Sequence, residues 1–153
     1  MGPLFYVGYD FAVIAAAITA QRGSSAVFDG GIIAYANEAK ERLLGVPKDT
    51  MIEHGSVSAE VAAVMAGAVR KQLRADIGLG VTGVAGPGGG TPDKPVGRVY
   101  LHLSGPNGTE QARMFDFSGD REAVRTQTVA EALGLVLDAL DPAAPSVAPP
   151  AAP

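Results

Sequence analysis

The 153-residue sequence contains no cysteine, no tryptophan and only two histidines, His54 and His102. Without cysteine, the chain has no disulfide, no thiolate zinc site and no cysteine nucleophile. Two imidazoles leave little from which to build a histidine metal site or a Ser-His-Asp triad. His102 lies on the mixed face of an expected strand and His54 precedes a glycine turn, so both fit structural roles better.

The chain also lacks a run or stripe of basic residues. Its 12 lysines and arginines stand against 16 aspartates and glutamates, which gives a net charge of −4. We therefore do not expect nucleic-acid binding. The longest apolar run, residues 11–20, is too short to cross a bilayer and has no basic start typical of a signal peptide. The expected protein is cytoplasmic and does not bind a membrane.

The composition is that of one globular domain. Hydrophobic residues make up 47% and charged residues 18% of the chain, and the length suffices for a real core. We assign residues 1–141 to this domain. Residues 142–153, "PAAPSVAPPAAP", are rich in proline and alanine and are predicted to be a disordered tail outside the fold.

Strand and helix patterns alternate along the domain. Apolar runs predict strands, and the spacing of apolar residues predicts helices that begin at capping residues. In chain order, the expected strands are residues 4–9, 31–35, 76–83, 96–105 and 109–117, the helices are 11–20, 38–44, 59–73 and 120–140, and the helix caps are Asp10, Asn37, Ser58 and Asp120.

The connections between these segments predict the fold class. Helix-linked strands favour parallel pairing, and the "GPNG" turn at 105–108 adds an antiparallel hairpin. The expected fold is a three-layer α/β/α domain with a mixed sheet of about five strands. In the strand 76–83, Gly78 and Gly80 share one face, which predicts a close approach of other backbone to that face.

The segment "VTGVAGPGGGTPDKPVG", residues 81–97, carries five glycines between Gly83 and Gly90. It matches neither the Gly-Lys-Ser/Thr phosphate loop nor the Gly-x-Gly-x-x-Gly dinucleotide motif. Its bare backbone N–H groups could still hold an anion or a developing oxyanion. From composition alone, a mobile surface loop is the favoured interpretation.

Two cationic positions carry a similar pair of alternatives. Lys40 lies early in its expected helix, where a cation opposes the helix dipole. It is either a solvated lysine, as most isolated lysines are, or a general base whose proton is easily lost. In "SGDREAVR", Arg121 and Arg125 are four residues apart on one helix face. They form either a solvated face or a clamp for phosphate or carboxylate.

Four blocks taken together change this assessment. The segments "GSSAVFDGGIIAYANEAKERLLGVP", "HGSVSAEVA", "VTGVAGPGGGTPDKPVGRVY" and "FSGDREAVR" resemble, in order and spacing, the C-terminal domain family of the competence/damage-inducible protein CinA. The resemblance covers residues 19–140. It implies a three-layer α/β/α domain and nicotinamide-nucleotide amidohydrolase activity, which converts nicotinamide mononucleotide and water to nicotinate mononucleotide and ammonia. It implies no metal and no organic cofactor.

The resemblance also assigns residues to a site. Lys40 would be the base that activates a serine, in a Ser-Lys form of amide hydrolysis. Thr82 would hydrogen-bond the reacting group, and Arg121 would pair with the substrate phosphate. The remaining implied residues line the pocket or hold substrate oxygens through their backbone: Tyr35, Asn37, Gly83, Ala85, Gly86, Gly88 and Gly89.

The N-terminal block, residues 1–18, departs from the family. The family has a block close to Glu-Ser-Cys-Thr-Gly-Gly, whose serine is the nucleophile, where this chain has "VGYDFA". Gly8 falls on the serine, Asp10 on the threonine, and Phe11 and Ala12 on the glycines. A preceding helix and part of the first strand are also missing.

Three explanations of this departure stay open. The protein is a non-catalytic relative, or its N-terminus reflects a shifted frame or a wrong start, or another hydroxyl such as Ser24, Ser25 or Thr82 serves. The last ranks lowest, because a nucleophile must lie within hydrogen-bond reach of its base. The function hypotheses are thus an amidohydrolase acting on a pyridine mononucleotide, a binding module without turnover, and a structural subunit of an oligomer. The sequence leaves open whether the chain forms a homo-oligomer.

Overall fold

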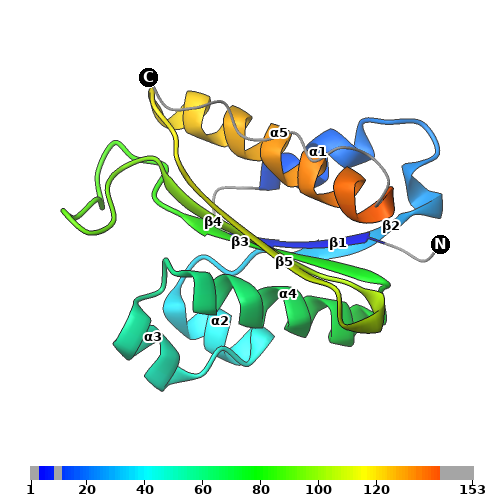
Figure 1. Ribbon diagram of the computed structural model, residues 1–153, viewed down its shortest axis with the longest axis horizontal. Helices are drawn as coiled ribbons and strands as arrows, with labels where there is room; N and C mark the ends of the chain where they lie inside the picture. Colours follow the sequence, from blue (N-terminus) through cyan, green and yellow to red (C-terminus); the bar gives the residue numbers. More distant parts are fainter. Residues whose placement is uncertain (1–3, 9–11, 142–153) are drawn as a thin grey trace.

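The computed structural model of the chain describes residues 4–8 and 12–141 (Figure 1). Five strands and five α-helices lie within these ranges. In chain order they are β1 (Leu4–Gly8), α1 (Ala12–Thr19), β2 (Phe28–Ile32), α2 (Asn37–Leu44), α3 (Lys48–His54), α4 (Ala59–Leu73), β3 (Ile77–Gly83), β4 (Arg98–Ser104), β5 (Glu110–Asp116) and α5 (Arg121–Leu140). The expected cap Asp10, the aromatic Phe11 and the tail 142–153 lie outside the described residues.

The strands form one sheet in the order β2-β1-β3-β4-β5. β1 pairs in parallel with both β2 and β3, whereas β3, β4 and β5 pair antiparallel. Figure 1 shows α1 and α5 on one face of this sheet and α2, α3 and α4 on the other. The predicted mixed α/β class is confirmed. The hairpin predicted at residues 105–108 joins β4 to β5 through a short 3-10 turn.

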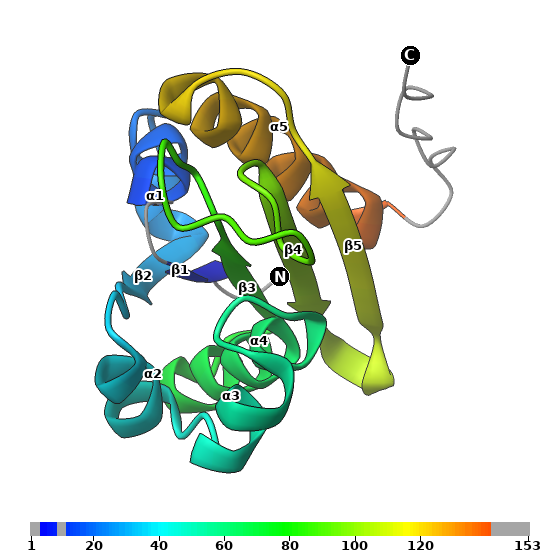
Figure 2. The same ribbon diagram turned by 90° about the vertical axis from the view of Figure 1, so that its left-hand side faces the viewer.

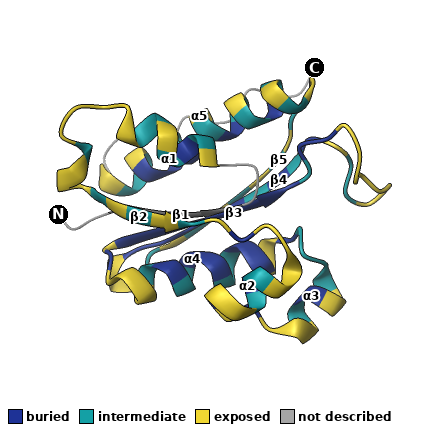
Figure 3. Cartoon of the chain, turned by 180° about the vertical axis from the view of Figure 1, so that it is seen from behind, coloured by how far each residue is buried: buried dark blue, intermediate teal, exposed yellow. Residues whose placement is uncertain are grey.

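Each face of the sheet has its own hydrophobic core. On the α1/α5 face, Leu79 and Leu101 pack with Leu135 of α5. On the α4 face, Val61 and Met65 pack with α2, α3 and the connection that follows α2. Figure 3 shows that α4 turns buried residues toward the sheet and exposed ones outward, as the amphipathic spacing of residues 59–73 predicts.

α4 lies close to β3 because Gly78 and Gly80 have no side chains. A Cβ at Gly80 would come within 2.1 Å of the carbonyl oxygen of Ala62, and one at Gly78 within 2.2 Å of that of Ala66. Only glycine allows this contact, since real Cβ atoms essentially never approach backbone so closely. The predicted close approach on this face is confirmed.

The predicted strand at 31–35 is wrong. β2 begins at Phe28 and ends at Ile32, because its ladder with β1 pairs Phe28 with Leu4 and Ile32 with Val7. After Ile32 the chain leaves the sheet and enters the α4 layer. The apolar run therefore continues into a connection where Ala34 is buried and Tyr35 is 65% exposed.

Two helix predictions also need correction. Asn37 is not an N-cap: it is the first residue of α2, and Ala36 caps the helix without a side-chain bond. The backbone explains the shift, since the Ala36 carbonyl oxygen accepts from the amides of Ala39 and Lys40, both at 3.1 Å. Helix α3 was not predicted, because its seven residues are too few to show a helical period. By contrast, Ser58 and Asp120 cap α4 and α5 through side-chain bonds, as predicted.

Within the described ranges, no helix combines the length and the apolar character that a membrane crossing requires.

Candidate functional site

Several elements meet at the carboxyl end of the parallel strands. β3 ends there at Gly83 and continues into a long loop, residues 84–97, which leads to β4. The beginnings of α4 and α5 lie at the same end, as Figures 1 and 2 show. In open α/β sheets, ligands bind outside the carboxyl ends of the strands, where loops and helix starts converge.

Lys40 and Thr82 approach each other at this end from different elements. Lys40 belongs to α2 and Thr82 to β3, and their exposed fractions are 4% and 1%. The Lys40 Nζ donates to the carbonyl oxygen of Ser56 at 3.4 Å, and the Thr82 Oγ1 donates to the same oxygen at 2.9 Å. Ser56 belongs to the turn between α3 and α4. This turn therefore brings the two polar side chains together.

The environment of Lys40 disfavours its charged form. Burial lowers the pKa of the Lys40 ammonium below its ordinary value, because the buried cation loses its hydration. The partner oxygen on Ser56 is neutral. A lysine with a lowered pKa holds more neutral amine near neutral pH, which is the form that a general base requires.

The loop of residues 84–97, called the glycine loop below, forms a wall beside Lys40 and Thr82. Its two ends are bound together, since the Val84 amide donates to the Arg98 carbonyl at 2.9 Å and the Gly97 amide to the Val84 carbonyl at 2.7 Å. Within the loop, the carbonyl oxygen of Gly86 accepts a hydrogen bond from Arg121 Nη1 at 2.9 Å. Gly86 has a φ of +84°, a conformation that favours glycine. The loop is therefore bonded to α5 through Gly86. Residues 87–93 are exposed, as in a surface loop, and the mobility expected from composition stays a prediction.

One cavity of about 290 Å³ contains these groups. Its lining includes every residue that the family resemblance assigned to the site: Tyr35, Asn37, Lys40, Thr82, Gly83, Ala85, Gly86, Gly88, Gly89 and Arg121. These residues come from α2 and the connection before it, from β3, from the glycine loop and from the start of α5. The predicted convergence on one cleft is confirmed as geometry, whereas the chemical roles stay predictions.

Three further residues line the cavity and were not predicted from the sequence: Ser56, Val57 and Val84. Ser56 is the most important of these, because its carbonyl oxygen binds both Lys40 and Thr82. The "HGSVSAEVA" block contained a sequence signal for the turn that holds Ser56. A glycine at position 55 followed by the Ser58 cap indicates a turn that delivers the residues between them to the amino end of α4.

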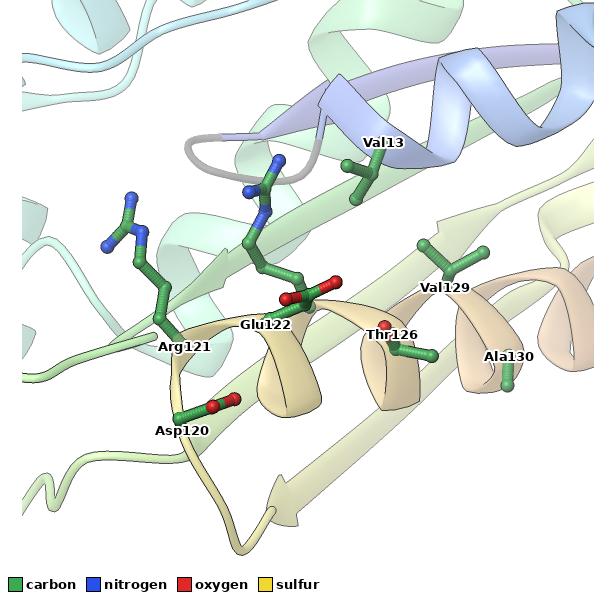
Figure 4. A pocket seen from close by; sticks show the side chains of 8 residues that line it. Val13, Asp120, Arg121, Glu122, Thr126, Val129 and Ala130 are labelled. Atoms are coloured by element: carbon green, nitrogen blue, oxygen red, sulfur yellow. The ribbon is translucent and has the colours of Figure 1, made fainter.

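A larger cavity of about 790 Å³ lies between α1 and α5 (Figure 4). Val13 of α1 faces Val129 of α5 across it, and Arg121 and Arg125 also line it. Arg121 lines both cavities. We place the candidate site in the smaller cavity, because that one holds the buried lysine and threonine.

The position aligned with the family's serine lies at the same end of the sheet. Gly8 is the last residue of β1, and it pairs with Val81, the residue before Thr82. Ser24 and Ser25 belong instead to a 3-10 turn just before β2, at the opposite end of that parallel strand. Of the three alternative hydroxyls, only that of Thr82 reaches the cavity.

The fold and the site together define a class: a mixed α/β domain with a buried lysine, a threonine and a glycine loop at the ends of its strands. The profile of the CinA C-terminal domain family matches residues 12–140. The chain belongs to the CinA C-terminal domain family.

Individual relatives agree with this assignment. A CinA-like protein from Anaeromyxobacter sp. (strain K) is 50% identical over 128 residues, 84% of this chain and 31% of the relative. A CinA-like protein from Geobacter sulfurreducens is 51% identical over 121 residues, 79% of this chain and 29% of the relative. The chain thus spans about a third of the length of these curated relatives.

Solved structures show the same fold. The crystal structure of competence/damage inducible protein CihA from Agrobacterium tumefaciens matches with a TM-score of 0.87 and 36% identity, covering 89% of this chain and 84% of that one. The competence damage-inducible protein A (ComA) from Klebsiella pneumoniae matches with a TM-score of 0.86 and 30% identity, covering 91% and 86%.

Proposed function

We propose that this chain is a nicotinamide-nucleotide amidohydrolase-family domain whose smaller cavity binds nicotinamide mononucleotide. One observation carries the proposal: Lys40, Thr82, the glycine-loop backbone and Arg121 line a single cavity at the ends of the strands. Amide hydrolysis requires a base, donors for the carbonyl oxygen and a means of holding the substrate. A mononucleotide adds one phosphate, for which an arginine is a suitable partner.

Each residue has a role in this proposal. Lys40, with its lowered pKa, takes the proton from an attacking hydroxyl and passes it to the departing ammonia. The Thr82 hydroxyl, whose single proton is donated to Ser56, accepts from the carboxamide nitrogen. The backbone amides of the glycine loop donate to the carboxamide oxygen as it gains negative charge. Arg121, which lines both cavities, binds the phosphate. Tyr35 and Asn37 line the mouth of the cavity.

The attacking hydroxyl is the missing part. Gly8 stands at the family's serine position and has no side chain; it pairs with Val81 at the end of β1. We therefore expect binding to be retained and turnover to be very slow. The same observation favours a second candidate function, a non-catalytic module that binds the nucleotide or a related anion.

Two measurements test the proposal. Isothermal titration calorimetry with nicotinamide mononucleotide reports binding, and ammonia release at high enzyme concentration reports turnover. Binding together with slow, Lys40-dependent ammonia release supports the amidohydrolase, and binding without ammonia release supports the module. If the purified chain does not bind the nucleotide, the amidohydrolase is wrong; if it binds neither the nucleotide nor inorganic phosphate, the module is wrong as well.

A further inference from the structure

The glycine loop has an attachment that none of the roles above uses. The Nζ of Lys94, near the far end of the loop, donates to the carbonyl oxygen of His54, the last residue of α3. A tight turn precedes it: the Lys94 amide donates to the Thr91 carbonyl, and the Thr91 amide donates to the Lys94 carbonyl at 2.9 Å. The loop is thereby joined to the α3–α4 turn, 40 residues away in the sequence.

The α3–α4 turn also provides the hydrogen-bond acceptor of the candidate site. His54 is two residues before Ser56, whose carbonyl oxygen binds Lys40 and Thr82. On its other side, the loop is bonded to Arg121 through Gly86. The loop thus spans the cavity between two cationic contacts, one on α5 and one at the end of α3.

We propose that Lys94 is a positioning residue that latches the glycine loop closed over the nucleotide cavity. This inference rests on the function proposed above for what the cavity binds, but the latch itself is a property of the free protein. Lys94 does not line the cavity, so it acts through the loop and does not touch the ligand.

The backbone of the glycine loop needs contacts to hold it in one conformation. Gly86, Gly88, Gly89 and Gly90 make this backbone flexible, and each ordered glycine costs more conformational entropy than any other residue. A loop of this kind presents its amides in a fixed array only when contacts hold it. The contact at Lys94 is favourable because a cation at a helix carboxyl end meets the unpaired carbonyls of the last turn.

Gly55 adapts the turn to this latch. Its φ is +79°, and a Cβ built on it would lie 2.6 Å from Lys94 Nζ. The same glycine therefore permits the sharp turn after α3 and leaves room for the ammonium group.

The test compares Lys94→Met with the natural chain by amide hydrogen exchange in the absence of any ligand. The Thr91 amide, whose bond lies in the tip held by the latch, should exchange about tenfold faster in the variant. The Val84 and Gly97 amides, which bind the loop ends together, should keep their rates. Lys71→Met, which replaces an exposed lysine near the end of α4, is the matched control and should change none of these rates.

Calorimetry with nicotinamide mononucleotide completes the test, and Lys94→Met should raise the Kd by about tenfold. Unchanged exchange at Thr91 would overturn the latch. Faster exchange with an unchanged Kd would overturn the positioning role. If the natural chain binds no nucleotide, the proposed function fails, and the exchange rates alone decide whether Lys94 holds the loop.

Discussion

Lys40 and Thr82 share one acceptor, the carbonyl oxygen of Ser56, which lies 3.4 Å from Lys40 Nζ and 2.9 Å from Thr82 Oγ1. This shared oxygen fixes the positions of two donors that come from different layers of the fold. Both donors are almost fully buried. A carboxamide entering the cavity would meet an ordered pair of polar groups, which is the condition for electrostatic preorganisation.

Replacing Lys40 with methionine should stabilise the protein. Burial disfavours the ammonium form and lowers its pKa from the ordinary value of 10.5. At pH values below the folded-state pKa, both the folded and the unfolded chain are protonated, and the desolvation cost is present in full. Lys40→Met removes this cost and should raise the free energy of unfolding by about 1 kcal/mol at neutral pH, measured by urea denaturation.

The difference in unfolding free energy between Lys40→Met and the natural chain should depend on pH, in the direction set by the lowered pKa of Lys40. As the pH rises above the folded-state pKa toward 10.5, the folded chain loses the Lys40 proton while the unfolded chain still holds it. The natural chain therefore gains stability relative to the variant, and the difference between them should shrink. A difference that stays constant or grows between pH 7 and about pH 10 would contradict the desolvation of Lys40. Lys71→Met, at an exposed position, serves as the control and should show no such trend.

Arg121 should supply more nucleotide affinity than any other single side chain. A charge-assisted contact to phosphate is worth roughly 1.5–3 kcal/mol, so Arg121→Ala should raise the Kd for nicotinamide mononucleotide by about one to two decades. Arg125→Ala, one turn later and lining only the larger cavity, should change it by less than about threefold. Calorimetry measures both, and equal affinity of the natural chain and Arg121→Ala would remove Arg121 from the site.

Much of this fold could be predicted because its signals are local. The Ser58 and Asp120 caps, the apolar stripe of α4 and the alternation in β4 each depend on a few neighbouring residues. β2 could not be placed correctly, because its bounds depend on pairing with β1, which lies more than twenty residues earlier. The apolar run through Ile33 and Tyr35 continues past the sheet, and periodicity alone does not show where the chain leaves it.

The candidate site, too, could be predicted from the sequence only in part. The family resemblance identified Lys40, Thr82 and Arg121, although each of them alone fits an ordinary structural role. Ser56 was missed because its contribution is a backbone carbonyl, which every residue type possesses. The contact between Lys94 and His54 was missed for the same reason, since the acceptor carries no side-chain signal in the sequence.

Glycine-to-alanine changes at Gly80 of β3 and Gly67 of α4 should have opposite effects on the free energy of unfolding. At Gly80, a Cβ would meet the Ala62 carbonyl oxygen at 2.1 Å, so Gly80→Ala should lower the free energy of unfolding by about 1–3 kcal/mol. At Gly67, inside α4, no heavy atom lies within 4 Å of the added Cβ, and Gly67→Ala should raise it by about 0.5–1 kcal/mol. Urea denaturation compares the two. Equal effects would mean that α4 does not lie as close to β3 as described.

The missing hydroxyl at Gly8 predicts that the natural chain hydrolyses nicotinamide mononucleotide very slowly or not at all. Lys40 needs a hydroxyl to deprotonate, and Gly8, which pairs with Val81 at the end of β1, cannot supply one. Loss of a nucleophile leaves positioning and oxyanion stabilisation, which amount to about 10³–10⁴-fold over water in well-studied hydrolases. Gly8→Ser alone should recover little, because the residues that follow it also differ from the family's block.

A restored chain tests this argument in full. Replacing residues 7–12 with Glu-Ser-Cys-Thr-Gly-Gly, and adding the family's preceding helix and strand segment, should recover turnover, because Lys40 and Thr82 are already together. Ammonia release is compared among the natural chain, the restored chain and the restored chain with Lys40→Ala, which should lose the recovered activity. Since Lys40 must act as a neutral amine, the recovered rate should rise with pH and level off below the ordinary lysine pKa of 10.5. Robust, Lys40-dependent turnover by the natural chain would contradict the assignment of the nucleophile, and Thr82→Val would then be the first variant to test, because Thr82 is the alternative hydroxyl that lines the cavity.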